Sequence, residues 1–585
     1  MVNSLCFQPR LRHRCLAVAV HTIVSSGLLI GMAHAQVTAP PSIDPTPELR
    51  RQQERDDAGR QRQAPRVDVQ PAPAAPVVPS RLPTETPCFD ISQIILRGDQ
   101  AERFSWTLGQ LDGPQHDDAP LGKCLGAQGI NVLLQRAQDA LVARGFVTSR
   151  ILAEPQDLKP GILALTVIPG RIRAIRFAPG TANRATAGNA VPASPGDVLN
   201  LRDIEQGLEN FKRVPTAEAD IKIEPADGAD AQPSYSDLVI TWQQAMPFRV
   251  SVSADDSGSK GTGKYQGSLT VSYDHWWTLN DLFYVTLNRD LGGADVGPRG
   301  TKARTLHYSV PYGYWSLAAT SSNSRYYQTV FGASQDYIYS GTSSNAEVKL
   351  SRLIYRDASR KTTLALRGFQ RKSNNYIDDT EVQVQQRTVG GWEGSASHRE
   401  FIGNATLDAS LAYKRGTGAF GSLPAPEEAF GEGTSRFALV TADVNVNAPF
   451  AIGDQKLKYS GAWRIQNNRT PLTPQDRFAI GGRFSVRGFD GEGSLSAERG
   501  WTVRNEIGLP LGQTSQEFYT ALDYGHVGGP SSDNLIGKNL AGAVMGLRGA
   551  LQGVQYEAFI ATPVRKPVGF RTAGKTVGFN LNYSF

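Results

Sequence analysis

The sequence predicts a transmembrane β-barrel of about 16 antiparallel strands, preceded by two small α/β domains and a polar helix near the amino terminus. Three observations support this fold class. The chain begins with an export signal, and its last 340 residues read as a series of alternating strands. The final strand alternates apolar and polar residues and ends on an aromatic. A wet barrel lumen also explains the negative mean hydropathy of a membrane protein.

Residues 1–35 are typical of a signal peptide. Three arginines precede an apolar stretch, residues 16–32, which ends in Ala33-His34-Ala35. A basic region, an apolar core and an A-x-A site predict cleavage after Ala35, whereas an anchor helix would not close on small residues. No later segment offers about 18 consecutive apolar residues, so the sequence predicts no transmembrane helix.

Residues 36–63 form a polar segment. From Pro47 to Gln63 nearly every side chain is charged or an amide, with little apolar face. Such a segment is either disordered or a helix in a wet environment, for example inside a water-filled pore. Residues 64–87 are Pro-rich and predict a semi-extended linker.

Four cysteines and the charge balance narrow the function classes. Cys6 and Cys15 leave with the signal peptide, so Cys88 and Cys124 remain and predict one disulfide in an exported chain. Their spacing does not suit a zinc site, and we expect no metal and no cofactor. The net charge of +6 is modest, so no nucleic-acid partner is expected.

Residues 88–170 and 171–245 predict two consecutive α/β domains. Each reads strand, helix, strand, strand, with helices expected over Gly129–Gly145 and Asn200–Lys212. Two adjacent units with one order of elements indicate an internal repeat of roughly 75 residues.

Residues 246–585 predict the barrel. Segments such as Tyr265–Asp274 alternate apolar and polar side chains, as strands between lipid and a wet lumen must. Short turns near 311–314, 447–454 and 510–516 alternate with longer Gly-, Ser- and Asp-rich loops. At roughly 20 residues per strand and connection, this length permits about 16 strands. Tyr583 and Phe585 end the last strand, as in bacterial outer-membrane barrels.

One connection, residues 467–500, is unusually long and contains Val486-Arg487-Gly488-Phe489. A structureless loop of this length in a compact protein is normally functional. Here the chain resembles the two-partner secretion transporters, the TpsB proteins of the haemolysin-activator and filamentous-haemagglutinin-transporter type. The resemblance covers nearly the whole mature chain. The loop matches the VRG(Y/F) tetrad of that family and Phe585 matches its terminal aromatic.

Cys88 begins a Cys-Phe-x-Ile sequence and Cys124 follows it, which is similar to the haemolysin-activator branch of the family. The resemblance implies two periplasmic POTRA domains and an N-terminal plug helix before the barrel. It also implies that the long loop folds into the lumen, where Arg487 pairs with Asp523 in Leu522-Asp523-Tyr524-Gly525 on the inner wall. The local alternation agrees, because the more apolar face of this segment leaves Asp523 facing inward.

The resemblance further implies a transporter of the Gram-negative outer membrane that secretes a large TpsA-type exoprotein. The POTRA domains would capture the unfolded chain in the periplasm by β-augmentation. Its cargo would be a haemolysin, an adhesin or a contact-dependent toxin, which the sequence does not distinguish. The expected partners besides cargo are outer-membrane lipid, the barrel-assembly machinery and periplasmic chaperones.

Three other classes of protein fit the sequence less well. A barrel-assembly insertase of the same superfamily is the main alternative, but it normally has more POTRA units and no plug helix. A nutrient porin would not need residues 88–245. An enzyme is disfavoured because no G-x-S-x-G or HExxH motif occurs, and His526 near Asp523 lacks a nucleophile, so no catalytic residue is expected.

Overall fold

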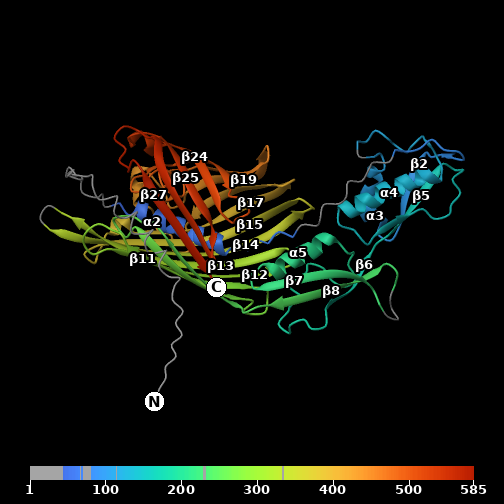
Figure 1. Ribbon diagram of the computed structural model, residues 1–585, viewed down its shortest axis with the longest axis horizontal. Helices are drawn as coiled ribbons and strands as arrows, with labels where there is room; N and C mark the ends of the chain where they lie inside the picture. Colours follow the sequence, from blue (N-terminus) through green and yellow to red (C-terminus); the bar gives the residue numbers. More distant parts are fainter. Residues whose placement is uncertain (1–43, 66, 70–80, 114, 228–231, 333–334) are drawn as a thin grey trace, which may run out of the picture.

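The computed structural model describes residues 44–65, 67–69, 81–113, 115–227, 232–332 and 335–585. The expected signal peptide and most of the expected linker lie outside these residues. A barrel with a helix inside it forms one part of the molecule, and two α/β domains extend from one end of the barrel (Figure 1). Among the described helices, none is long and apolar enough to span a membrane.

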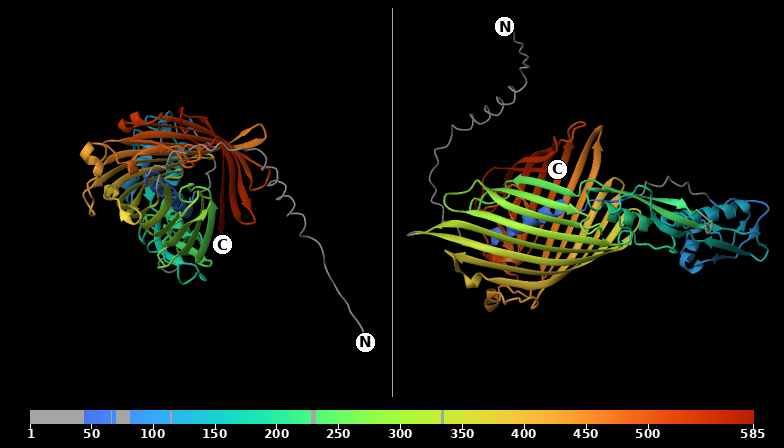
Figure 2. Two further views of the ribbon diagram at one scale, coloured as in Figure 1. Left: turned by 90° about the vertical axis from the view of Figure 1, so that its left-hand side faces the viewer. Right: turned by 90° about the horizontal axis from the view of Figure 1, so that it is seen from below.

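Helix α2, Thr46–Gln63, lies within the barrel (Figure 2). Its 18 residues span about 27 Å, close to the thickness of a bilayer core. Near its start, Glu48 contacts the loop after the first barrel strand, and near its end Gln63 contacts Arg249 at the opposite end of that strand. The helix therefore runs along the lumen. Of the two alternatives for this segment, the helix in a wet environment is confirmed.

The first α/β domain has a three-stranded sheet in the order β2-β5-β4. Its elements are β1 (Phe89–Asp90), β2 (Gln93–Gly98), α3 (Ala101–Phe104), the 3-10 helix η1 (Ser105–Gln110), β3 (Cys124–Leu125), α4 (Ala127–Ala143), β4 (Arg150–Leu152) and β5 (Ile162–Ile168). The disulfide Cys88–Cys124 is confirmed, and β1 pairs with β3 beside it. The sequence missed α3 and η1, which are too short to show a helical period.

The second domain repeats this topology with β6 (Arg171–Phe177), α5 (Leu201–Lys212), β7 (Ala217–Pro225) and β8 (Tyr235–Gln244). In both sheets the last of the three strands in chain order is central, parallel to the first strand and antiparallel to the second. Asn200 caps α5, since its side chain accepts a hydrogen bond from the Arg202 amide. The core includes Phe211, Leu238 and Trp242.

Sixteen long strands close into an antiparallel barrel, as predicted. They are β9 (Phe248–Asp255), β10 (Tyr265–Asp274), β11 (Leu282–Gly292), β12 (Gly300–Tyr312), β13 (Trp315–Phe331), β14 (Asp336–Arg356), β15 (Arg360–Ile377), β17 (Arg387–Ile402), β18 (Ala405–Thr417), β19 (Ala438–Ile452), β20 (Gln455–Asn468), β23 (Arg499–Pro510), β24 (Glu517–Gly528), β25 (Asn539–Leu551), β26 (Val554–Arg565) and β27 (Thr576–Ser584). The connections between strands hold the two-residue strand β16 (Thr380–Glu381) and the 3-10 helices η2 (Gln383–Gln385), η3 (Pro426–Phe430) and η5 (Pro530–Asn534).

The barrel closes between β27 and β9, which pair antiparallel from Asn580↔Asp255 to Ser584↔Ser251. Phe585 extends this seam, because its amide and carbonyl both hydrogen-bond to the backbone of Val250, at 3.0 and 2.9 Å. The ring centroids of Tyr583 and Phe585 are 5.6 Å apart. The terminal aromatics predicted from the sequence thus stand at the closing edge of the barrel.

Candidate functional site

Residues 469–498, between β20 and β23, fold back into the lumen as a compact unit, here called the lumenal hairpin. The expectation of a structureless connection is wrong. The hairpin contains the 3-10 helix η4 (Pro474–Asp476) and the strands β21 (Phe478–Ile480) and β22 (Leu495–Ala497), which pair antiparallel. Backbone groups enclosed in a barrel must find partners, and strand pairing supplies them. Both flanking barrel strands are also longer than the sequence suggested.

An apolar cluster fixes the hairpin to the wall. Phe478, Ile480, Val486, Phe489, Leu495, Ala497, Val527, Leu540 and Phe570 form one buried group. Phe489 packs edge-on against Phe570 with ring centroids 5.7 Å apart. The hairpin and the barrel wall therefore share a small apolar core inside the lumen.

Arg487 and Asp523 meet at the centre of this site. The Arg487 side chain donates from Nε to Asp523 Oδ2 at 2.8 Å and from Nη2 to Oδ1 at 2.9 Å. Its backbone amide also donates to Oδ2, at 3.0 Å. Asp523 is fully buried on the inner face of β24 while Leu522 is 55% exposed on the outer face. A two-point fork of this kind fixes direction as well as distance.

Arg487 also binds a second carboxylate. Its Nη1 donates to Glu506 Oε2 at 2.8 Å, and Arg548 approaches the other oxygen of Glu506 at 2.7 Å. Arg548 pairs in turn with Glu517. Asp523, Glu506, Glu517 and Arg548 of the wall thus form one ionic network with the hairpin arginine, and Arg504 on β23 lies at its edge, 3.7 Å from Asp523. The sequence predicted Asp523 but not Glu506, Glu517 or Arg548.

The two glycines of the sequence motifs are required by close backbone approach. Gly488 has φ +109°, and a Cβ there would lie 2.6 Å from the Thr562 carbonyl oxygen. A Cβ on Gly525 would lie 2.7 Å from Val486 Cγ2. A third glycine, Gly542 in β25, faces the Arg487 carbonyl so closely that any side chain would overlap it. The hairpin therefore lies directly on the barrel wall at its arginine.

A second arginine of the hairpin contacts the barrel seam. Arg483 Nη1 donates to Asp256 Oδ1 at 2.7 Å and to the Phe579 carbonyl at 3.1 Å. Asp256 Oδ1 also accepts from the Phe579 amide at 3.0 Å. Asp256 follows β9 and Phe579 lies in β27, so Arg483 joins both sides of the closing pair. No sequence pattern predicted this contact, although Arg483 lies only four residues before Arg487.

Helix α2 is held in the lumen mainly by polar contacts. Arg50 donates to the carbonyl of Pro474 in the lumenal hairpin at 3.4 Å. Glu48 accepts from Thr262 at 3.0 Å, and Arg60 lies 3.4 Å from Glu347 on β14. Leu49 is the apolar exception and packs beside buried tyrosines of the wall.

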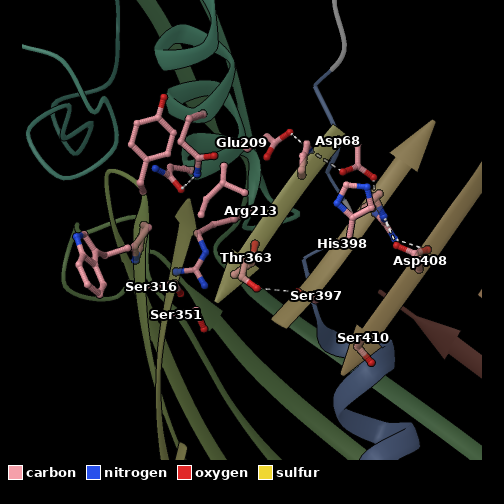
Figure 3. Close-up of a pocket in the computed structure, with 18 of the residues that line it drawn as sticks. Asp68, Glu209, Arg213, Ser316, Ser351, Thr363, Ser397, His398, Asp408 and Ser410 are labelled. Carbon is pink, nitrogen blue, oxygen red and sulfur yellow. Dashed lines mark hydrogen bonds and ion pairs between the residues drawn. The ribbon is translucent and has the colours of Figure 1, made fainter. Parts of the chain in front are cut away.

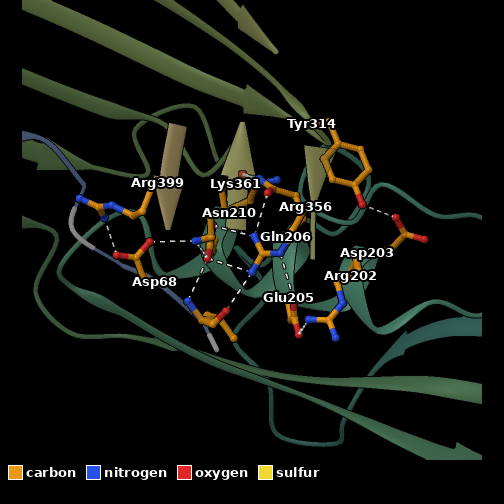
Figure 4. Close-up of polar contacts among 12 residues, drawn as sticks. Asp68, Arg202, Asp203, Glu205, Gln206, Asn210, Tyr314, Arg356, Lys361 and Arg399 are labelled. Atoms are coloured by element: carbon orange, nitrogen blue, oxygen red, sulfur yellow. Dashed lines mark hydrogen bonds and ion pairs between the residues drawn. The ribbon is translucent and has the colours of Figure 1, made fainter. Parts of the chain in front are cut away.

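A third set of contacts joins the barrel rim, the linker and the second α/β domain (Figure 4). We call Asp68, Glu209, Arg356, Lys361 and Arg399 the rim network. Arg356 at the end of β14 pairs with Glu209 of α5 at 3.0 Å and donates to the Val69 carbonyl at 2.9 Å. Asp68 accepts from Lys361 at 2.8 Å and from Arg399 at 2.6 Å. The linker after α2 is thus tied between the domain and the barrel.

Beside the rim network lies a polar cavity of about 440 Å³ (Figure 3). Its lining combines Arg213 of the second domain with inward side chains of the barrel, including Ser316, Ser351, Ser397 and Ser410. Small hydroxyls and charges leave this end of the lumen wet, as a passage for a polar chain requires.

The remaining sequence candidates are placed elsewhere. His526 lies against Trp501 on the outer face of the barrel, whereas Asp523 faces inward, so they form no dyad. Within the described residues, no cluster of three or more His, Cys, Asp or Glu side chains could hold a metal ion.

These features define a class of protein: an outer-membrane β-barrel transporter with two periplasmic α/β domains, a lumenal helix and an inward hairpin. The family described as haemolysin secretion/activation protein ShlB/FhaC/HecB matches residues 234–549. POTRA domain families match residues 89–170, in the ShlB-type form, and residues 171–225. The chain therefore belongs to this haemolysin secretion/activation family, the TpsB transporters of two-partner secretion.

Comparison with individual relatives supports this family assignment. The outer membrane transporter CdiB-2 of Burkholderia pseudomallei (strain 1026b) is 37% identical over 553 residues, covering 92% of this chain and 93% of that protein. The outer membrane transporter CdiB of Dickeya dadantii (strain 3937) is 28% identical over 507 residues, covering 85% and 87%. The solved structure of CdiB from Acinetobacter baumannii has a TM-score of 0.81 at 29% identity and covers 94% of this chain and 100% of that one. The family, fold, transport function and outer-membrane location expected from the sequence are confirmed.

Proposed function

We propose that this transporter exports one large TpsA-type exoprotein, a haemolysin, an adhesin or a contact-dependent toxin, as an unfolded chain through its lumen. The filling of the lumen is the observation that supports this most strongly. A polar helix and a hairpin close the pore through side-chain contacts, so displacing α2 opens a wet path without disturbing the wall. Its action is binding and conduction, with no catalysis of its own.

Capture begins on strand β7 in POTRA 2. In the described residues β7 pairs only with β8, so its other edge is free to add an extended strand. Backbone hydrogen bonds would bind the cargo with little dependence on its sequence. The Thr216 hydroxyl, next to β7, donates to Asp274 on the barrel rim at 3.0 Å. A strand added to β7 therefore starts beside the periplasmic mouth of the lumen.

The Arg487–Asp523 fork fixes the hairpin while the plug moves. The contacts of the hairpin with β24 and with the seam do not involve α2, so these two anchors remain when the helix leaves. The hairpin thus stays in place and forms part of the wall along which the cargo passes. The periplasm supplies no ATP, and folding of the cargo outside the cell makes export one-way.

Assembly of the transporter needs further partners. Tyr583 and Phe585 end the closing strand and are the signal that we propose the barrel-assembly machinery reads. Periplasmic chaperones would deliver both the transporter and its cargo, and membrane lipid would surround the apolar outer face of the barrel.

Disulfide scanning tests the capture step. Asp220 on β7 and Thr241 on β8 are directly paired, exposed and on the same face of the sheet. Asp220→Cys and Thr241→Cys would each be combined with a cargo fragment stalled in transit and carrying single cysteines. A disulfide needs Cα atoms within about 7 Å, which a strand added to β7 offers to position 220 but not to position 241. Cross-links at 220 alone support the proposal, and equal or absent cross-linking at both positions contradicts it.

A further inference from the structure

Four basic side chains lie on the outer face of the barrel, toward its extracellular end. They are Arg289 of β11, Lys302 and Arg304 of β12, and Arg325 of β13. All four are exposed, whereas Thr301 and Thr305, at alternate positions of β12, are buried toward the lumen. Lipid-facing positions of a barrel are normally apolar, so this cluster needs an explanation.

Strand register brings three of these cations into one row. Arg289 pairs with Lys302, and Lys302 pairs with Arg325. Arg304 lies two residues from Lys302 on the same face and pairs with Leu287 and Asn323. Like charges directly opposite each other on adjacent strands repel, so the row by itself is unfavourable and an anion would stabilise it.

Among the residues that the structure describes, no acidic group neutralises the row. Within the part of the chain that the structure describes, none of the four side chains forms an ion pair or a hydrogen bond. The outward residues of the neighbouring strands at these levels are Gly267, Leu269, Thr342 and Ser344. The counter-charge must therefore come from outside the chain.

A groove for an apolar chain adjoins the row. It has a volume of about 650 Å³ and is lined by all four cations together with Val252, Leu269, Leu287 and Leu291. A cationic cluster at one side of an apolar groove is complementary to a lipid that has an anionic headgroup and acyl chains.

The row of cations lies at the depth in the membrane at which lipid headgroups are found. Arg325 lies ten residues from Trp315, which stands at the periplasmic end of β13. At about 3.3 Å per residue and a strand tilt of about 40°, this corresponds to about 25 Å along the membrane normal, the height of the apolar band of such barrels. At the periplasmic end, Trp276 packs on Phe283, two residues from the turn, as part of an aromatic girdle. The cations therefore lie at the outer-leaflet interface.

We propose that Arg289, Lys302, Arg304 and Arg325 bind the phosphate groups of a phosphorylated lipid of the outer leaflet, whose acyl chain occupies the adjoining groove. The site holds the lipid against β11 to β13, next to the strands that lead to the barrel seam. It is independent of the cargo path, because these side chains face away from the lumen.

Lipid retention by the full-length protein tests this. Wild type and variants would be reconstituted in phosphatidylcholine nanodiscs containing a small fraction of lipid A, and the retained lipid A measured by native mass spectrometry. K302Q/R325Q removes two members of the row, and R352Q/K456Q removes two cations near the periplasmic end as the matched control. K302R/R325K keeps the charge and tests rescue, so a folding defect is separated from a binding defect.

We expect K302Q/R325Q to lower lipid A retention roughly tenfold or more, because each surface cation contributes to anionic-lipid binding. The control and the charge-conserving variant should retain lipid A as the wild type does. Equal retention by all variants would overturn the proposal. Displacement of lipid A by millimolar inorganic phosphate would also overturn it, since a site for free phosphate needs no groove.

Discussion

Val486 of the lumenal hairpin and Gly525 of strand β24 lie in such close contact that no side chain fits between them. A Cβ on Gly525 would lie 2.7 Å from Val486 Cγ2 and 2.9 Å from Ile480 Cγ2. Asp523, two residues earlier on the same inward face, receives the Arg487 fork. Gly525 and Asp523 therefore serve the same contact, since Gly525 leaves space for the hairpin and Asp523 binds it.

Gly525→Ala should displace the hairpin and reduce export. Overpacking of an enclosed contact costs about 1–3 kcal/mol, and the hairpin can relieve it only by leaving the wall. The readout is the amount of cargo released per folded transporter in the outer membrane. Gly528→Ala on the same strand is the control, because its nearest neighbour, His526 Nε2, is 3.4 Å from the added Cβ. Normal export by G525A would show that the close contact is not needed.

Deleting residues 47–63 should raise single-channel conductance in planar bilayers while export continues. The helix fills the lumen but contributes little to the barrel core, since its contacts are mainly polar. A variant that keeps the helix and replaces only Leu49 by Ala serves as the control and should conduct as the wild type does. Conductance that is unchanged by the deletion would mean that α2 does not limit the pore.

Sequence patterns predicted the elements of this protein better than their contacts. Alternation along β24 was enough to place Asp523 inward, because strand side chains must alternate between lipid and lumen. The motif around Arg487 then suggested its partner. Arg483 had no such guide: its partners Asp256 and Phe579 lie more than 90 residues away, at a seam that exists only once the barrel closes.

The rim network shows the same limit. Glu209 reads as an ordinary charge on a helix surface and Arg356 as an ordinary strand end, and only the docking of POTRA 2 on the barrel brings them together. The β21–β22 pair of the lumenal hairpin was missed because three-residue strands are too short to show alternation. Local periodicity therefore gives the fold class, while long-range charge pairing depends on the closed barrel.

The Cys88–Cys124 disulfide should stabilise POTRA 1 selectively. The bond joins residues 36 apart in sequence, and closing such a loop restricts the unfolded state by roughly 4 kcal/mol in the entropy model. Denatured, unreduced mature protein should contain no thiol that reacts with a maleimide. After reduction, hydrogen exchange should increase in residues 88–170 and stay unchanged in POTRA 2. Two reactive thiols before reduction would refute the bond.

Acid should weaken POTRA 2 through Asp237. This buried carboxylate binds Arg173 at 2.8 and 2.6 Å, and that fork, with help from Arg176, holds the pKa of Asp237 below its ordinary value. A lowered folded-state pKa means that the pair stabilises the domain above pH of about 4 and that this stability is lost as the pH falls through the folded pKa.

Asp237→Asn should therefore lower the stability of POTRA 2 near neutral pH by about 1–3 kcal/mol and remove part of its acid sensitivity. Hydrogen exchange of β6 to β8 in the full-length protein, corrected with an unstructured peptide at each pH, measures both effects. Asp220→Asn, an exposed carboxylate of the same sheet, is the control. A variant with the same acid profile as the wild type would contradict the assigned role of Asp237.

We propose that Arg487 and Asp523 act as one unit in export. Arg487→Ala releases the hairpin and leaves Asp523 with its main partner gone, and Asp523→Ala has the converse effect. Both variants should form heat-modifiable barrels in the outer membrane, because neither residue belongs to the seam. Arg504→Ala is the control, since Arg504 lies 3.7 Å from Asp523 without a hydrogen bond.

The most direct measurement is a double-mutant cycle on cargo secretion, normalised to folded transporter. We expect each single variant to lose most secretion and R487A/D523A to be little worse than either, because residues acting through one contact are not additive. Near-normal secretion by both single variants, or defects that multiply in the double variant as independent effects do, would contradict this proposal.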